Sequence, residues 1–244
     1  MFGWRARIGL ILPSNNTVME NEFLMAVQEG VSVHTTRLGP VRDATWETLI
    51  KMSDHAERAA EELACCGVDI IVYGCTSGSF LKGPKFEEEL TDRIYKISNI
   101  TSFTTSKAVL EGLRSLGSKN IAIASPYSQM TNEAEKKFLE AEGFRVFQIE
   151  GLGIIRPTDI GRLSPYQAYA MAKRVNSEEV DTLFISCTDL RTFEIISPLE
   201  RDLRKKVITS NQASLWMAIQ LLGLDTEDMG KKFGSLFSCE IRKS

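Results

Sequence analysis

The chain has 244 residues, 43% hydrophobic and 25% charged, which is ordinary for a globular protein with a substantial core. Its formal net charge of −3 provides no basic surface for nucleic acid or an anionic membrane, and no apolar run reaches the roughly 20 residues of a membrane span. The first residues run into a strand without a signal-peptide pattern, so we expect a cytoplasmic protein whose main partner is a small molecule.

Short runs rich in Ile, Val and Leu alternate with helix-length amphipathic segments along the whole chain. This alternation predicts βαβ units, in which parallel strands are buried on both faces by helices. Strands are expected at about 6–12, 31–38, 69–74 and 100–103, then at 119–124, 144–149, 181–186 and 206–209.

Helices are expected between these strands. The clearest spans 45–66 before Gly67, with His55 on its surface. Others are expected at 108–117, at 133–142, from Ser164-Pro165 onward and at 211–222, whereas the tail 224–244 has no strong period.

One strand pattern occurs twice in the chain. The segments DIIVYGCT and DTLFISCT place Cys75 and Cys187 112 residues apart, and Pro13 and Pro126 follow two other strands 113 residues apart. Similar offsets at independent places indicate two halves of one architecture. We therefore predict a subdomain at 1–117, completed by the C-terminal segment 211–244, a second subdomain at 118–210, and an active site in the cleft between them.

The ends of these strands carry small polar phrases that begin near Pro13, Gly74, Pro126 and Cys187. In parallel α/β sheets, ligands bind at the carboxyl ends of strands, where loops and helix N-termini present N–H groups. None of the phrases is a dinucleotide-binding or Walker loop. They suit a carboxylate better than a nucleotide.

The thiols are the only obvious acid–base pair. The chain has five cysteines and two histidines, without C-x-x-C or paired-ligand spacing, so neither a disulfide framework nor a metal is expected. A cysteine near a helix N-terminus has its thiolate favoured, giving a nucleophile or base near neutral pH.

Two schemes are open for such a pair. Cys75 and Cys187 on opposite sides of one carbon can remove a proton from one face and return one to the other. Alternatively, one thiolate adds to a double bond, allows rotation and leaves again. A lone Cys at a strand end is more often a buried hydrophobe, but recurrence in both halves favours chemistry; Cys65, Cys66 and Cys239 are expected to be incidental.

These motifs resemble the aspartate/glutamate racemase superfamily, in the branch of maleate cis-trans isomerase, arylmalonate decarboxylase and an ectoine-utilisation protein. The resemblance covers about residues 5–223 and rests on GLILPSNNTVME from Gly9, TTSKAVLEGLRSLG from Thr104 and SNQA from Ser210. It implies two pseudo-symmetric Rossmann-like α/β subdomains, each with a mostly parallel four-stranded sheet flanked by helices. It also implies cofactor-independent chemistry and, by analogy, a homodimer or homotetramer.

The resemblance also implies roles for individual residues. Cys75 matches the cysteine that adds to the substrate, and Cys187 matches the proton donor. The positions implied to bind the carboxylate substrate, or to lie beside it, are Ser14, Asn16, Thr17, Thr76, Ser77, Tyr127 and Thr188. Asn16 and Thr17 could instead only cap a helix, Tyr127 could be a turn residue, and Asp189 could only start the following helix.

Two departures bear on the substrate. The decarboxylase has glycine at the first cysteine position, so Cys75 argues against decarboxylation. Isomerases place an asparagine before their G-R-L phrase where this chain has Pro157, so a second carboxylate would have to be bound by Arg156. The expected activity is isomerisation of a small carboxylate or dicarboxylate, with maleate to fumarate as the nearest named reaction. The alternatives are a two-thiol racemase of an amino acid or ectoine-derived acid, an arylmalonate-type decarboxylase, and a non-catalytic carboxylate-binding protein.

Overall fold

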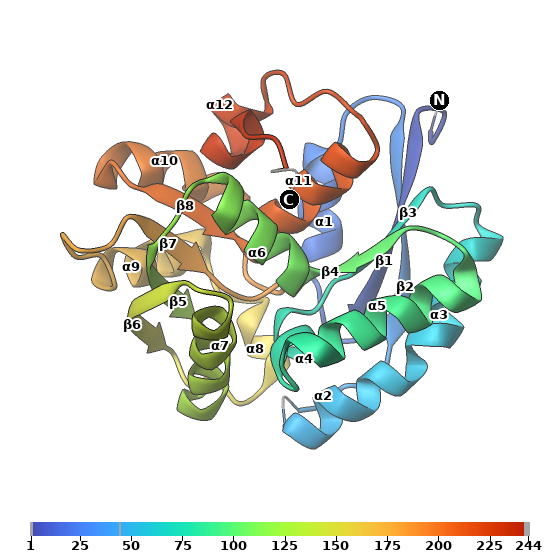
Figure 1. The fold of residues 1–244 in the computed structure, drawn as a ribbon, viewed down its shortest axis with the longest axis horizontal. Coiled ribbons are helices and arrows are strands. Elements are labelled where there is room, and N and C mark those ends of the chain that lie inside the picture. The colour runs from blue at the N-terminus through green and yellow to red at the C-terminus, as the bar shows by residue number, and fades with distance from the viewer. Residues whose placement is uncertain (1, 44, 242–244) are drawn as a thin grey trace.

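The computed structural model describes residues 2–43 and 45–241. Within them the chain forms two four-stranded parallel sheets, ordered β2-β1-β3-β4 and β6-β5-β7-β8 (Figure 1). The predicted strands are confirmed: β1 Ala6–Pro13, β2 Val31–Leu38, β3 Ile70–Tyr73, β4 Ser102–Thr104, β5 Asn120–Ser125, β6 Arg145–Gly151, β7 Thr182–Ile185 and β8 Lys206–Thr209.

Helices cover the sheets on both sides. They are α1 Met19–Ala26, α2 Trp46–Met52, α3 Ala56–Cys65, α4 Thr76–Phe80, α5 Pro84–Ser98, α6 Thr105–Ser115, α7 Gln129–Ala141, α8 Pro157–Ile160, α9 Pro165–Arg174, α10 Phe193–Leu203, α11 Ser210–Leu221 and α12 Met229–Phe233. The start of α9 is a full capping box, in which Ser164 and Gln167 exchange hydrogen bonds.

The two sheets have the same strand order, so the repeat seen in the sequence is a repeat of topology. In each sheet the chain crosses from one side of the first strand to the other, which puts a topological switch point between β1 and β3 and another between β5 and β7. Loops at the carboxyl ends of such strands form ligand sites. The predicted polar phrases follow these four strands.

The single helix predicted over 45–66 is wrong: a 3₁₀ turn, Ser53–His55, separates α2 from α3. Two contacts account for the break. The Ser53 hydroxyl donates to the Ile50 carbonyl at 2.6 Å, and Arg93 on α5 donates to the Ser53 carbonyl at 3.1 Å. A carbonyl held by a side chain from another helix is drawn away from the helical hydrogen-bond ladder.

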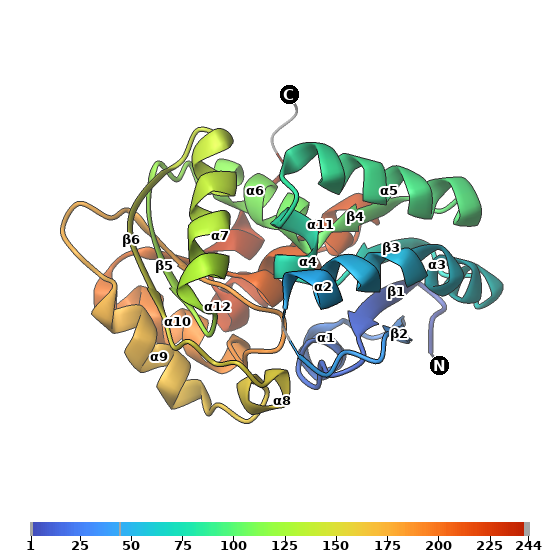
Figure 2. The same cartoon turned by 90° about the horizontal axis from the view of Figure 1, so that it is seen from below.

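Helix α11 lies between the two sheets (Figures 1 and 2), where it packs against α6 and contacts β3 and β8. Its Trp216 is fully buried and donates to the Cys239 carbonyl at 3.0 Å. That contact ties down the tail, which forms α12 and a 3₁₀ turn at Ser235–Ser238. Helix α11 contacts a strand of each sheet and so does not belong to one half alone. The subdomain boundaries predicted at 117 and 210 therefore stay a prediction.

Candidate active site

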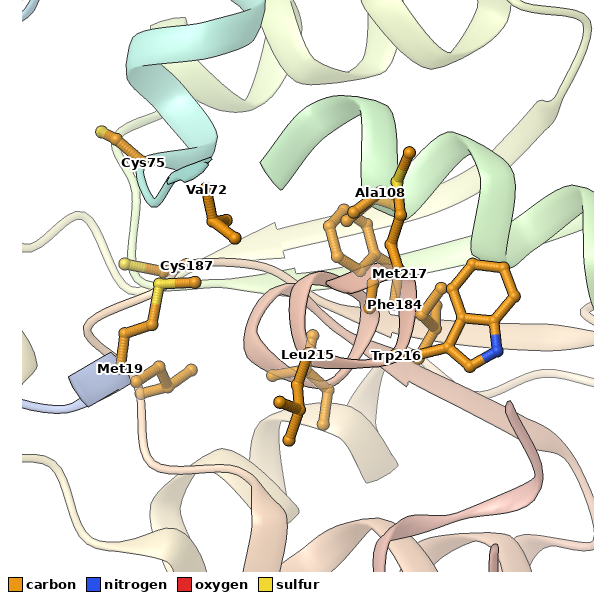
Figure 3. Close-up of a cluster of buried hydrophobic side chains, with 14 of the residues drawn as sticks. Met19, Val72, Cys75, Ala108, Phe184, Cys187, Leu215, Trp216 and Met217 are labelled. Atoms are coloured by element: carbon orange, nitrogen blue, oxygen red, sulfur yellow. The ribbon is translucent and has the colours of Figure 1, made fainter. Parts of the chain in front are cut away.

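A cavity of about 240 Å³ lies where the loops after β1, β3, β5 and β7 meet. It opens between the two halves, and both predicted cysteines line it. Figure 3 shows the two side chains at the edge of a buried cluster, with their sulfur atoms pointing the same way, away from Trp216 and Met217 of α11. The repeated Cys-Thr phrases therefore serve one site.

Cys75 caps the N-terminus of α4. The Gly78 N–H donates to its Sγ at 3.3 Å, and the Ser77 hydroxyl lies 3.9 Å from the same atom. A Cβ on Gly78 would lie 2.9 Å from this sulfur, closer than real Cβ atoms approach, so the tight turn requires glycine. The local sequence thus directs N–H and O–H donors at the thiol.

Cys187 occupies a strained conformation, with φ of 107°. Non-glycine residues at positive φ cost about 1–3 kcal/mol and concentrate at functional sites. Its N–H donates to the Ser210 hydroxyl at 3.0 Å, and that hydroxyl accepts from Thr76 at 2.9 Å. The Asp189 N–H donates to the Cys187 sulfur at 3.4 Å. Ser210 therefore fixes both cysteine loops to α11.

The structure reverses the expectation that these thiols ionise easily. Burial raises the pKa of Cys75 to about 11, and the hydrogen bonds from Gly78 and Ser77 offset only part of that effect. Burial also raises the pKa of Cys187, to which the nearby Asp189 carboxylate adds. In this enclosed site, a thiolate loses more stabilisation from water than it gains from the N-terminus of one short helix. Cys187 is consequently a neutral thiol at pH 7.

Asn16 joins the two halves at the cavity wall. Its amide donates to the Thr188 hydroxyl at 3.0 Å, and that hydroxyl donates to the Gly74 carbonyl at 3.1 Å. Its Oδ1 accepts from the N–H groups of Val18 and Met19, both at 3.1 Å. Asn16 thus caps the start of α1 and also holds the loop of the second cysteine.

Asp189 is a wall residue, not merely the start of a helix, since α10 begins at Phe193. Its Oδ1 accepts from the Thr17 N–H at 2.7 Å, and its buried Oδ2 has no hydrogen-bond partner. Burial raises the pKa of this carboxyl to about 6, although the hydrogen bonds from Thr17 act against the rise. Above that pH the cavity contains an anionic wall.

Seven of the ten predicted site residues line the cavity: Asn16, Cys75, Thr76, Ser77, Tyr127, Cys187 and Thr188. The other three do not. The Ser14 hydroxyl accepts from the Val41 N–H, and Thr17 binds Asp189.

The third outlier, Arg156, has a side chain that is 68% exposed and forms two 2.9 Å hydrogen bonds with Asp159. The suggestion that Arg156 binds a second carboxylate is therefore a poor fit, because the pairing with Asp159 holds its guanidinium outside. The neighbouring Pro157 lines the cavity instead, with Ile154, Ile155 and Ile160.

The sequence patterns indicate no role for three buried polar residues around the site: Ser210, Glu22 and Glu135. Ser210 follows the carboxyl end of β8, so the rule for strand ends could have found it. The two glutamates lie on amphipathic helices and look like surface residues. In the described part of the chain, no group of three His, Cys, Asp or Glu residues could hold a metal, and no helix is long and apolar enough to cross a membrane.

Comparison with known proteins gives consistent matches. The family model for arylmalonate decarboxylase matches residues 8–237. A maleate isomerase from Nocardia farcinica is 28% identical over 89% of this chain and 90% of its own length. An arylmalonate decarboxylase from Bordetella bronchiseptica is 30% identical over 76% of this chain and 77% of its own length.

A solved structure is similar over nearly the whole chain. It is the Nocardia farcinica maleate cis-trans isomerase, as a serine-for-cysteine mutant with a covalently bound succinylcysteine intermediate. The similarity has a TM-score of 0.89 at 25% identity and covers 98% of this chain and 99% of that one.

Proposed function

Because this chain belongs to the arylmalonate decarboxylase family, we propose that it is a cofactor-independent cis-trans isomerase of a small unsaturated carboxylate, with maleate to fumarate as the nearest named reaction. The observation that carries the proposal is the pair of thiols, Cys75 and Cys187, that reach one cavity from corresponding loops of the two halves. The relatives named maleate isomerase, one trapped as a succinylcysteine adduct, support the same chemistry.

The site residues divide the work as follows. The N–H groups of Thr76, Ser77 and Thr188, with the Ser77 hydroxyl, hold the substrate carboxylate and stabilise the negative charge that develops on it. The Cys75 thiolate forms a C–S bond with one alkene carbon, and the Cys187 thiol transfers its proton to the other. Rotation about the new single bond follows; Cys187 then takes back a proton and the C–S bond breaks.

The cavity binds its ligand without a cation. None of the described residues that line it is Lys, Arg or His, so a carboxylate is held by neutral donors. The wall formed by Ile154, Ile155, Pro157 and Ile160 also faces the ligand with apolar surface. A substrate panel should therefore include maleate and its alkyl-substituted derivatives.

Proton NMR of the isomerisation tests this function. The wild type should convert the cis alkene, while Cys75→Ser and Cys187→Ser should each lose at least about a hundredfold in rate because each removes a reacting group. Cys65→Ser is the matched control, since that thiol is exposed and outside the cavity. Full activity in both cavity variants would refute the thiol mechanism.

One observation favours a second candidate, a two-thiol racemase of an amino acid. Asp189 lines the cavity, and its carboxyl group provides a negative charge for the ammonium group of such a substrate. In D₂O, a racemase would place deuterium on the α-carbon of the amino acid and leave maleate unchanged. The free thiols of Cys65, Cys66, Cys75 and Cys187 fit the cytoplasmic location that we propose.

A further inference from the structure

The active-site cavity has two chemically different sides. The loops after β3 and β7 surround the two thiols with hydrogen-bond donors, whereas the segments that follow β2 and β6 contribute mainly apolar side chains. Figure 2 shows α8, part of the second segment, at the boundary between the two halves. We call this second side the apolar wall; it consists of Val41, Leu49, Ile154, Pro157 and Ile160.

The thiol side has donors for one carboxylate. The hydroxyl of Thr76 already donates to Ser210 at 2.9 Å. That of Thr188 donates to the Gly74 carbonyl at 3.1 Å. The N–H groups of Thr76 and Ser77 open α4 and have no acceptor within that helix. With the Thr188 N–H and the Ser77 hydroxyl they match the roughly four hydrogen bonds that the two oxygens of one carboxylate can accept.

The apolar wall has its backbone donors committed elsewhere. The Val41 N–H donates to the Ser14 hydroxyl at 2.8 Å. The Ile154 N–H donates to the Pro126 carbonyl at 2.9 Å. Pro157 has no N–H at all. A carboxylate against this wall would therefore lose its hydration without gaining hydrogen bonds in return.

The charges at the cavity disfavour a second carboxylate as well. Its described lining includes two carboxyl groups, Asp43 and Asp189, and no Lys, Arg or His. Asp43 accepts from the Thr48 hydroxyl at 2.7 Å, a hydrogen bond that lowers the pKa of this carboxyl. Arg156 does not offset these charges, because its guanidinium is paired with Asp159 outside the cavity. Each negative charge on a ligand adds to the repulsion.

We propose that the substrate is a cis alkene with a single carboxylate, whose second substituent is uncharged and packs on the apolar wall, with Pro157 as the residue that excludes a second carboxylate. The proposal rests on the function proposed above and specifies its substrate class. The carboxylate binds the N–H groups beside Cys75 and Cys187, and the other substituent faces the wall. A half-ester of maleic acid has both features, and its ester carbonyl also helps the alkene to accept the Cys75 thiolate.

Binding of saturated analogues tests this preference without the reaction. Isothermal titration calorimetry is performed at pH 8, where Asp189, with a pKa of about 6, is ionised. Monomethyl succinate should bind at least about tenfold more tightly than succinate, because the second carboxylate of succinate finds neither a donor nor a cation at the wall. Equal binding of the two, or tighter binding of succinate, would overturn the proposal.

Pro157→Asn tests the residue held responsible. The asparagine side chain adds an amide donor to the wall, so the preference for monomethyl succinate should shrink about tenfold. Pro157→Ala is the matched control, since it replaces the same proline at the start of α8 without adding a donor, and its preference should stay within about twofold of the wild type. Equal preferences in the asparagine and alanine variants would refute the role of Pro157.

Isomerisation of maleate and monomethyl maleate, followed by proton NMR, separates this inference from the proposed function. Each kcat/KM is divided by the rate at which 2-mercaptoethanol adds to the same alkene, which corrects for the higher reactivity of the ester. The corrected value should be at least about tenfold higher for the half-ester. If maleate is converted as well or better, the inference falls and the function stands. If neither alkene is converted but monomethyl succinate binds more tightly, the charge preference stands and the function falls.

Discussion

Glu22 joins the two halves through a buried carboxylate, and replacing it should change the pH dependence of folding. Its Oε1 accepts from the N–H groups of Thr192 and Phe193, at 2.5 and 2.9 Å, at the start of α10. Its Oε2 accepts from the Asn211 amide at 2.6 Å. Burial nevertheless outweighs these bonds and raises the pKa of the carboxyl to about 7, from an ordinary value of 4.5.

The magnitude follows from that difference. Below pH 4.5 the carboxyl is protonated in the folded and the unfolded chain. Between 4.5 and about 7 the unfolded chain releases the proton while the folded chain keeps it, so the free energy of unfolding falls as the pH rises. At about 1.4 kcal/mol per pH unit, the wild type should lose about 3 kcal/mol relative to Glu22→Gln between pH 4.5 and pH 8.

Urea unfolding of the wild type and of Glu22→Gln at pH 4.5, 6 and 8 measures this difference. The contributions of all other titrating groups are the same in both proteins and cancel. Glutamine keeps the shape of the side chain, and its Oε1 can still accept from the N–H groups of Thr192 and Phe193. Glu20→Gln, in the same helix but part-exposed and paired with Arg37, is the control and should show no such trend. A difference that stays within about 0.5 kcal/mol over the pH range would refute the reasoning.

Three further substitutions test the site. Ser210→Ala should lower the free energy of unfolding by about 1–3 kcal/mol, because it leaves the buried Cys187 N–H without an acceptor, and should also lower kcat; calorimetry and kinetics that match the wild type would contradict this. Gly78→Ala should reduce turnover, because its Cβ would come within 2.9 Å of the Cys75 sulfur; unchanged kcat would show that the turn adapts. Arg156→Ala should leave KM unchanged, because the side chain lies outside the cavity; a large rise in KM would restore it as a substrate ligand.

The fold was largely predictable from the sequence because buried parallel strands leave a strong signal. The apolar runs around Ile71 and Phe184 place β3 and β7 to within a residue or two, and the repeat of Cys75 and Cys187 identifies the two halves. The break at Ser53 was not predictable, because it depends on a contact from Arg93, 40 residues away in the chain.

The sequence predicted which residues form the site better than it predicted their protonation states. The raised pKa values of the two thiols depend on how completely the fold removes water from them, which no local motif encodes. The burial of Glu22 and Glu135 has the same origin, since each lies on the inner face of a helix whose packing partner is distant in sequence. Sequence patterns locate reactive residues at strand ends, whereas their protonation states follow from tertiary packing.

Mass spectrometry of the Cys187→Ser variant after incubation with maleate tests the central claim most directly. In this variant the second alkene carbon has to take its proton from water, and no thiol is left to remove a proton again. A C–S adduct on Cys75 should therefore form slowly and accumulate, and the peptide that contains Cys75 should gain the mass of one substrate molecule. An unmodified Cys75 peptide, or an adduct confined to the exposed Cys65 and Cys66, would contradict the account.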